Sequence, residues 1–326
     1  MTPPTNFRGH PLKRQSLGRT TATSACSSGE LGTSQPGTFP ASTRAHGIAS
    51  EYGAPMDGHN QFPGTASYSL KLSEQELTRY RMMAASAADN EAAEWSTAGI
   101  LPGARIADVG CGPGAILRLL AERIGAEGRA VGIDADPSAV SIARQQTAGL
   151  PQVQVQVGHA DATRLDPGAY DVVMCRHVLA HNGGREAMIV AHLASLAATG
   201  GCVYLVDVDA TALRFTPIGP ELQDLQERYR EFHRARGNDL SVALRLGDLL
   251  TDAGLTVERY ACRAPVIRVP PGMRPPSWAA RDDMVAEGFA TDADVKRWED
   301  AFARLDAAQH RPWLFPANFV AIGRRV

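Results

Sequence analysis

The sequence lacks any apolar run long enough to cross a bilayer, and it lacks an excess of either charge. Its 326 residues carry a formal net charge of −2, with a pI of about 6.5. This balance gives the whole molecule no electrostatic attraction to nucleic acid or to an anionic membrane. We therefore expect a cytoplasmic protein without nucleic-acid or membrane partners, whose oligomeric state stays open.

Cysteine is also scarce and unpatterned. The five cysteines are odd in number, and no Cys-x-x-Cys pair occurs. Neither a disulfide framework nor a zinc site is predicted, and we expect no metal. Cys111, Cys175 and Cys202 fall on or beside predicted central strands, where a thiol packs as a small hydrophobe in a reducing compartment.

Residues 1 to 66 lack hydrophobic periodicity, and acidic side chains are sparse there. About half of these residues are Ser, Thr, Gly or Pro, and no apolar core of a signal peptide is present. A disordered tail, a transit-like segment and a start codon placed upstream of a true start at Met56 are three open explanations. We expect a disordered tail over 1–66 and one domain over 67–326, and we assign the tail no function.

The pattern changes from Tyr68 onward, where helix and strand signals alternate. The run 73–76 predicts a helix start with Ser73 as N-cap, and the helix continues to about Trp95. After this helix, strand and helix patterns alternate, and such a βαβ order is typical of a parallel, doubly wound α/β sheet. Strands are predicted near 105–109, 129–134, 153–158, 171–176 and 202–207, and helices near 115–125, 137–147 and 185–198.

The rhythm loosens beyond Asp209, so the domain divides into a helical cap (68–98), a core (100–210) and a C-terminal part (211–326). In the last part Gly254 is the predicted C-cap of the second helix, and prolines break the strand that follows. Two late strands joined by a long connection suit an antiparallel pair at the end of the sheet. The predicted elements are helices at 221–236 and 240–253, a strand at 256–269, a helical lid insert within 271–310 with helices at 278–287 and 292–308, and a strand at 318–323.

The most informative segment is the strand-to-helix turn at 106–115. A glycine turn lets backbone N–H groups crowd against a ligand, because glycine has no Cβ to block the approach. Gly110, Gly112 and Ala115 satisfy the dinucleotide fingerprint, which is weak evidence on its own. The segment also resembles motif I of the class I S-adenosylmethionine (SAM)-dependent methyltransferases, acidic-x-Gly-x-Gly-x-Gly, with Asp108 and Gly114 completing the pattern. A carboxylate ahead of the turn would repel a pyrophosphate but suits the cationic amino-acid end of SAM.

Two later motifs in the same order strengthen this resemblance. Asp134 matches the family's acidic position that accepts both ribose hydroxyls, while Asp136 is predicted to cap the next helix with Pro137 at its first position. By resemblance, Asp161 faces the adenine amino group and the N–H of Ala162 faces a ring nitrogen; an isolated Asp would by default be a turn residue. The resemblance implies a Rossmann-like seven-stranded sheet of order 3-2-1-4-5-7-6, with the last strand antiparallel. The expected SAM-binding residues are Asp108, Gly110, Cys111, Gly112, Gly114, Asp134, Ala135, Asp161, Ala162 and Arg176.

The exit of the fourth strand is the expected place of methyl transfer. The segment 176–179 reads Arg-His-Val-Leu, where enzymes that methylate base amines usually carry Asn/Asp-Pro-Pro-aromatic. Cys175 follows Met174 rather than a proline, so the cytosine-C5 nucleophile motif is absent too. The remaining pattern resembles the small-molecule branch of the family. His181 is offered as general base and His177 as the second candidate, since imidazole titrates in the right range. Either imidazole could instead only orient the loop.

The acceptor side is expected to be built from segments outside the motifs. Asp207, at the end of strand five, could orient His181, bind a cationic acceptor or cap the following segment. Tyr80, Tyr229 and His233 are expected to face the substrate, although such aromatic residues are more often simple packing. The sequence predicts a SAM-dependent methyltransferase acting on O, N or C of a small-molecule metabolite. A SAM-binding protein without transferase activity and an RNA or protein methyltransferase are the alternatives.

Overall fold

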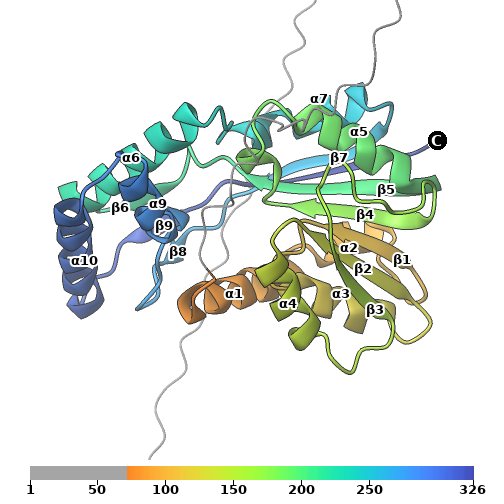
Figure 1. Ribbon diagram of the computed structural model, residues 1–326, viewed down its shortest axis with the longest axis horizontal. Helices are drawn as coiled ribbons and strands as arrows, with labels where there is room; N and C mark the ends of the chain where they lie inside the picture. Colours follow the sequence, from red (N-terminus) through yellow and green to blue (C-terminus); the bar gives the residue numbers. More distant parts are fainter. Residues whose placement is uncertain (1–71) are drawn as a thin grey trace, which may run out of the picture. The chain divides into compact units, whose positions relative to one another are not determined.

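The computed structural model describes residues 72–326 (Figure 1). The predicted tail at 1–66, Cys26 and the alternative start at Met56 lie outside the described residues. Within the described part, no helix is both long and apolar enough to cross a membrane. The helices are α1 (Glu74–Asn90), α2 (Ala92–Ala98), α3 (Ala115–Ile124), α4 (Pro137–Gln146), α5 (Glu186–Leu196), α6 (Pro220–Ala235), α7 (Leu246–Asp252), α8 (Pro276–Ala279), α9 (Arg281–Ala286) and α10 (Asp292–Ala307), with 3₁₀ turns η1 (Leu179–His181) and η2 (Val242–Arg245).

The strands form one large and one small sheet. The seven-stranded sheet has the order β3-β2-β1-β4-β5-β10-β7, in which β10 runs antiparallel to both of its neighbours. Renumbered along this sheet, the order is 3-2-1-4-5-7-6, so the predicted fold is confirmed. The strands are β1 (Arg105–Val109), β2 (Arg129–Asp134), β3 (Val153–Val157), β4 (Tyr170–Arg176), β5 (Ala197–Val208), β6 (Arg214–Thr216), β7 (Thr256–Arg263), β8 (Ile267–Arg268), β9 (Trp313–Phe315) and β10 (Asn318–Arg324).

The late antiparallel pair is interrupted by the insert, which carries a small sheet of its own. The predicted single strand over 256–269 is wrong, because β7 ends at Arg263 and β8 pairs with β9 instead. Two short strands, β6 and β9, were not predicted, and they complete a three-stranded sheet of order β6-β9-β8. Three-residue strands give no periodic signal, so only their long-range pairing defines them.

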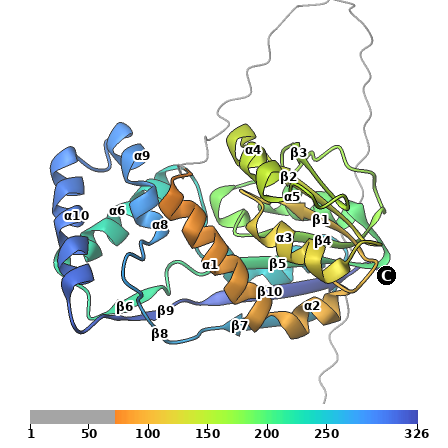
Figure 2. The ribbon, with the colours of Figure 1, turned by 90° about the horizontal axis from the view of Figure 1, so that it is seen from below.

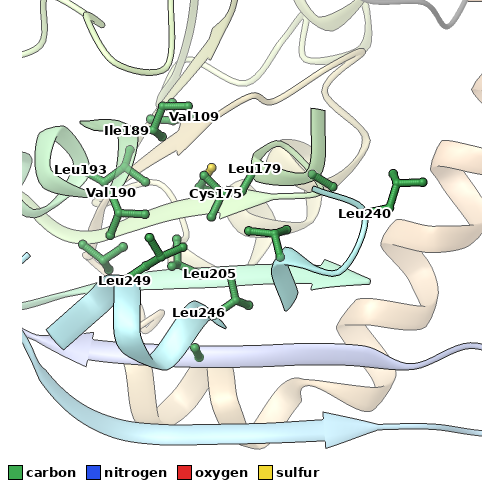
Figure 3. Packing of buried hydrophobic residues seen from close by; sticks show 14 of the residues in the cluster. Val109, Cys175, Leu179, Ile189, Val190, Leu193, Leu205, Leu240, Leu246 and Leu249 are labelled. Carbon is green, nitrogen blue, oxygen red and sulfur yellow. The ribbon is translucent and has the colours of Figure 1, made fainter. Parts of the chain in front are cut away.

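Helices cover both faces of the large sheet and create two hydrophobic layers. In Figure 1, α5 and α7 lie on one side of the sheet and α2, α3 and α4 on the other. Figure 3 shows the first layer, in which Val190 and Leu249 meet Leu205 of β5. Met174 and Tyr204 belong to the opposite layer, because successive strand residues point to opposite faces. Each fully buried aliphatic side chain in these layers contributes about 1.5–3 kcal/mol of transfer free energy.

Several predicted helix boundaries are confirmed. The predicted helix at 278–287 is instead divided at Ala280 into α8 and α9, and two other helices need correction. Ser73 caps α1 by accepting the N–H of Glu76, and Asp136 caps α4 with Pro137 in the first turn. The first helix does not run unbroken to Trp95, because Glu91 leaves helical geometry and α2 starts a new helix. The predicted helix at 240–253 begins as the 3₁₀ turn η2. Both irregularities result from tertiary packing, which overrides helix propensity.

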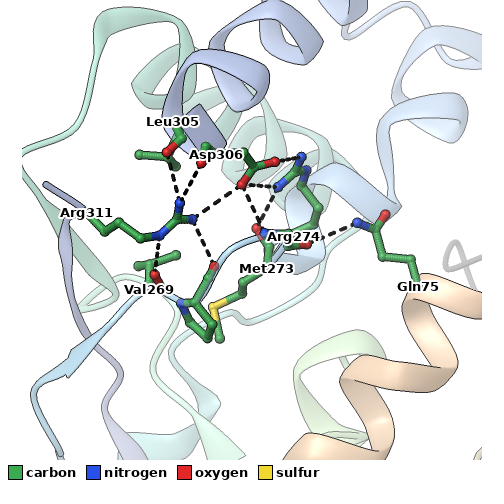
Figure 4. A network of polar contacts seen from close by, with 9 residues as sticks. Gln75, Val269, Met273, Arg274, Leu305, Asp306 and Arg311 are labelled. Atoms are coloured by element: carbon green, nitrogen blue, oxygen red, sulfur yellow. Dashed lines mark hydrogen bonds and ion pairs between the residues drawn. The ribbon is translucent and has the colours of Figure 1, made fainter. Parts of the chain in front are cut away.

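A polar network closes the insert against α1 (Figure 4). Arg311 donates to the backbone carbonyls of Val269 and Leu305, at 2.6 and 3.0 Å. Asp306 accepts from Arg274 at 2.6 Å, and that bond holds the pKa of Asp306 down to about 2. Gln75 of α1 donates to the carbonyl of Gly272 at 3.2 Å. The proline-rich loop at 269–275, between β8 and α8, is therefore fixed to both α10 and α1, and Figure 2 shows these elements.

Candidate functional site

The glycine turn after β1 has the backbone geometry that only glycine adopts without strain. Gly110, Gly112 and Gly114 have φ of +81°, +53° and +83°. A Cβ on Gly110 would lie 2.2 Å from Cγ2 of Val178, and one on Gly114 would lie 2.9 Å from Cβ of Ala143. The turn is therefore packed against both the exit of β4 and helix α4.

The N–H groups of this turn are used within the protein, contrary to the sequence-based expectation that they face the ligand. Gly110 and Cys111 both donate to the carbonyl of Ile133, at 2.7 and 3.0 Å. Gly112 donates to Oδ2 of Asp134 at 2.8 Å, and Gly114 donates to the carbonyl of Cys111. These bonds fasten the turn to the end of β2. The glycines thus let the backbone of the turn lie close to its neighbouring segments. The side chain of Cys111 is buried and packs beside Gly132.

Asp108 provides a buried carboxylate with an oxygen that has no partner. The residue is 1% exposed, and its Oδ2 atom makes no hydrogen bond. Burial raises the pKa of this carboxyl to about 7, although Arg176 acts in the opposite direction. A buried, unsatisfied acceptor is costly unless a ligand pairs with it. An ammonium group at this point would satisfy it, so Asp108 fits the amino-acid end of SAM.

Asp134 and Asp161 follow the ends of β2 and β3, as the motif order predicts. Asp134 accepts the N–H of Gly112 and the N–H of Asp136, at 2.8 and 2.9 Å. A carboxylate has about four lone pairs, so capacity for two ribose hydroxyls remains. Asp161 is ion-paired with Arg185, at the start of α5, and Ala162 is exposed. Ala135 is exposed as well, next to Asp134.

Arg176, expected to bind SAM, is engaged by a residue that the sequence did not indicate. Its guanidinium forms a two-point ion pair with Glu91, at 2.6 and 3.0 Å. The hydroxyl of Tyr204 also donates to Glu91, at 2.8 Å. These groups lie on the face of the sheet that carries Asp108. The ion pair ties the start of α2 to β4. The positive charge of Arg176 also acts on Asp108.

The two candidate bases follow β4 directly. His177 has a φ of +56°, and its N–H is bonded to the carbonyl of Val206 at 2.8 Å. His181 ends the turn η1. Burial lowers the pKa of His177 to about 3 and that of His181 to about 4, and the positive charge of Arg79 adds to both shifts. Both imidazoles are therefore neutral at neutral pH.

Asp207 stabilises the turn that carries His181. Its carboxylate accepts the N–H of Ala180 at 3.2 Å and the N–H of Val208 at 2.9 Å. Of the three roles considered for Asp207, these contacts match capping, although of η1 rather than of the segment that follows. Burial raises its pKa to about 7. Unlike Asp108, which has an oxygen without a partner, this carboxyl accepts a backbone N–H at each of its two oxygens.

The predicted substrate residues converge on the same place from α1 and α6. The ring of Tyr80 lies over the turn, 3.4 Å from where a Cβ of Gly112 would be. The rings of Tyr229 and His233 are 4.4 Å apart, and those of His181 and His233 are 5.1 Å apart. Desolvation raises the pKa of Tyr229, whose charged surroundings include Arg79 and Asp207. The structure thus brings Tyr80, His181, Tyr229 and His233 together.

A separate apolar cavity lies beside the N-terminal half of α6. It encloses about 450 Å³ of empty volume, part of it open to solvent, between α6, α10 and the small sheet. Leu222 and Gln226 line it, and they share one face of α6 with Tyr229 and His233, because residues three, four and seven apart stack on a helix. The other lining residues are Phe215, Pro217, Ile218, Gly219, Val269, Met273, Pro275, Phe302, Leu305 and Pro312.

Sequence patterns missed the residues that act through long-range contacts. Glu91, which pairs with Arg176, and Arg79, whose charge acts on both histidines, belong to no motif and were not predicted. A break in the α1 pattern at Glu91 was the only signal present, and it reads equally well as a helix end. Their roles depend on which strands and helices become neighbours.

Comparison with known proteins agrees with the geometry. A model of the methyltransferase domain matches residues 106–201. A ubiquinone biosynthesis O-methyltransferase of Xanthomonas campestris is 34% identical over 175 residues, covering 50% of this chain and 71% of that protein. A 37.1 kDa protein in a transposon of Streptomyces fradiae is 30% identical over 156 residues, 48% of this chain, and the chain spans 44% of it. A SAM-dependent methyltransferase structure from Aquifex aeolicus has a TM-score of 0.43 at 16% identity, covering 74% of this chain and 97% of that one.

The chain belongs to the class I SAM-dependent methyltransferases. The strand order, the glycine turn and the matched domain agree on this family, and SAM is its cofactor. The dinucleotide interpretation of the turn is therefore set aside.

Proposed function

We propose that the protein transfers the methyl group of SAM to an acidic hydroxyl, phenolic or enolic, of a small molecule. SAM supplies an activated methyl on a sulfonium, so the protein mainly positions the acceptor and manages charge. The observation that carries the proposal is the pair of neutral imidazoles at the exit of β4, where Val178, between them in the chain, packs against Gly110 of the glycine turn.

His181 is the proposed base. A neutral imidazole accepts a proton, but one with a pKa of about 4 is a weak base. It assists an acceptor that loses its proton readily, which favours a phenol or enol over an aliphatic alcohol. His177 is less suited, because its backbone is held in a left-handed conformation by the bond to Val206.

The size of the acceptor is suggested by its surroundings. The cavity lined by Leu222 and Gln226 is mostly apolar, as small-molecule pockets usually are. A relative that carries the name ubiquinone biosynthesis O-methyltransferase is consistent with methylation at oxygen. We therefore propose a small acceptor with an apolar portion directed along α6.

Product analysis tests the proposal. The full chain is incubated with [methyl-¹³C]SAM and separate panels of phenols, enols, aliphatic alcohols and amines, and products are identified by mass spectrometry. Labelled O-methyl products from the phenol or enol panels are expected. SAM binding without product from any panel would favour the non-catalytic alternative, and N-methyl products alone would overturn the proposed acceptor.

Variants assign the base. His181→Asn is expected to lower kcat roughly a hundredfold or more, within the usual range for a lost general base. His177→Asn should reduce it less. His310→Asn, at an exposed position beyond α10, is the matched control and should leave kcat unchanged. Equal rates for the His181 and His310 variants would remove His181 from the mechanism.

A further inference from the structure

The imidazole of His233 is held by a chain of hydrogen bonds that starts on the loop after η1. Gly183 donates its backbone N–H to Oδ1 of Asn238 at 3.2 Å. Nδ2 of Asn238 lies 2.9 Å from Nδ1 of His233. Because an amide oxygen cannot donate, the bond from Gly183 fixes which end of the Asn238 amide faces the imidazole. The NH₂ group therefore donates to Nδ1.

This arrangement dictates the tautomer of His233. A neutral imidazole carries its proton on one nitrogen only, and Nδ1 is occupied as an acceptor. The proton must then lie on Nε2. Burial lowers the pKa of His233 to about 3, so the ring is neutral at neutral pH.

The Nε2–H of His233 is a buried donor without a partner. His233 is 1% exposed, and Nε2 makes no hydrogen bond. Its ring is enclosed by Tyr229 at 4.4 Å and His181 at 5.1 Å, both of which belong to the proposed acceptor site. An unsatisfied buried donor of this kind costs about 1–3 kcal/mol, which a ligand acceptor atom would recover.

Close backbone packing keeps the chain of bonds in place. A Cβ on Gly183 would lie 1.8 Å from the carbonyl oxygen of Gly237. The loop after η1 thus contacts the end of α6 directly, and the segment that carries His181 is locked to the segment that carries His233.

We propose that Asn238 is a positioning residue that sets the tautomer of His233, and that the Nε2–H of His233 donates a hydrogen bond to an oxygen atom of the methyl acceptor. The proposal rests on the proposed function, because it deepens the description of the same acceptor site. It assigns the acceptor a carbonyl, carboxylate or phenolic oxygen near Tyr229.

The tautomer is tested by NMR on protein labelled with ¹⁵N-histidine, with His233 assigned by comparison with His233→Gln. In the wild-type protein, Nε2 should be protonated and Nδ1 bare. Asn238→Asp keeps an oxygen for the N–H of Gly183 but places a second acceptor against Nδ1, so the proton should move from Nε2 to Nδ1. A wild-type Nδ1–H form, or an unchanged tautomer in Asn238→Asp, would overturn the positioning role.

The donor role is tested with phenol as the oxygen probe and toluene as its isostere without oxygen. Titrated into protein saturated with S-adenosylhomocysteine, phenol should shift the His233 Nε2–H resonance, and toluene should not. No shift up to the solubility limit of phenol, or an equal shift with toluene, would overturn the donor role. Neither measurement requires methyl transfer, so failure of the proposed function is recognised separately.

Once an acceptor is known, kinetics complete the test. Asn238→Asp should lower kcat/KM about tenfold to a hundredfold, because the donor is lost and replaced by an acceptor. Adding His233→Gln to Asn238→Asp should restore most of the lost kcat/KM, because the glutamine amide N–H can take the place of the Nε2–H donor. The SAM dissociation constant should stay constant throughout. Unchanged kcat/KM in Asn238→Asp would contradict the proposal.

Discussion

The SAM side and the acceptor side of the site meet at the glycine turn, but they are built differently. On the proposed SAM side, Asp108 lies in β1, Asp134 ends β2 and Asp161 follows β3, all in the parallel part of the sheet. On the acceptor side, Tyr80, His181 and His233 come from a helix, a 3₁₀ turn and another helix. The first group is fixed by the βαβ rhythm, whereas the second depends on contacts between distant segments.

Helix α1 contacts both the SAM side and the acceptor side, and a substitution at its C-cap residue, Glu91, has the largest expected effect. Glu91→Ala would leave Arg176 buried without its counter-charge, and breaking such a pair costs about 3–5 kcal/mol. We expect this loss in the free energy of unfolding measured by urea denaturation. SAM and acceptor affinities should both weaken, because α1 carries Tyr80 over the turn.

A surface pair provides the control for this variant. Glu122 and Arg118 form an ion pair with about half of each side chain exposed, at 53% and 59%. Glu122→Ala should change the unfolding free energy by less than about 0.5 kcal/mol. A Glu91→Ala protein as stable as the Glu122→Ala protein would mean that the buried pair does not fasten α2 to the sheet.

The second prediction is aimed at the SAM side. Gly110→Ala places a methyl 2.2 Å from Val178 in a left-handed backbone. The backbone strain is about 1–2 kcal/mol, and the overpacking adds about 1–3 kcal/mol. We expect the SAM dissociation constant, measured by calorimetry, to rise at least about tenfold, which is 1.4 kcal/mol.

Gly103→Ala separates strain from overlap. Gly103 has a φ of +85°, but a Cβ there would contact nothing within 4 Å. This variant should lose about 1–2 kcal/mol of stability through strain and keep its SAM affinity. If both alanine variants bound SAM equally well, the overlap at Gly110 would be irrelevant to the cofactor site.

The third prediction breaks the acceptor side alone. Gly183→Ala would overlap the backbone of Gly237, which cannot move aside as a flexible side chain does. Overpacking of this kind costs about 1–3 kcal/mol. The acceptor KM should rise while the SAM dissociation constant stays constant. In Gly184→Ala the added Cβ would contact nothing within 4 Å, although the φ of +78° strains the backbone. This variant should leave KM unchanged. A Gly183→Ala protein with wild-type KM would show that the two segments need not be locked.

The same contrast explains what the sequence could predict. The strands, the glycine turn and the three carboxylates depend on short motifs and on a period that each segment carries itself, whereas the strand order was implied by the resemblance to the methyltransferase family. The placement of His181 after β4 and of Asp207 near the end of β5 was predictable from the same local patterns. The bond from Gly183 to Asn238, and the ion pair of Glu91 with Arg176, join residues 55 and 85 positions apart. No local pattern encodes such partners, and the short strands β6 and β9 were missed for this reason.

The last prediction concerns two buried carboxyls, Asp108 and Asp207, one on each side. Burial raises the pKa of both to about 7 in the folded protein, from 3.8. Each therefore stabilises the fold fully below about pH 4, and that contribution is lost as the pH rises through 7. Without SAM, the free energy of unfolding should fall between about pH 4 and pH 7. Asp207→Asn should reduce this slope.

Only the carboxyl on the SAM side should couple its proton to the cofactor. Asp108 has an oxygen without a partner, whereas Asp207 already accepts two backbone amides. An ammonium near Asp108 favours its ionised form, so SAM binding below about pH 7 should expel a proton. The SAM dissociation constant should then rise as the pH falls, by at most about tenfold per pH unit, or 1.4 kcal/mol.

Calorimetry at about pH 6, in two buffers of different ionisation enthalpy, measures that proton. Asp108→Asn should remove the release that occurs near pH 7. Asp207→Asn should keep the full release. If proton release on SAM binding disappeared in Asp207→Asn but persisted in Asp108→Asn, the carboxyl coupled to the cofactor would be Asp207, on the acceptor side. The proposed contact between Asp108 and the ammonium group of SAM would then be wrong.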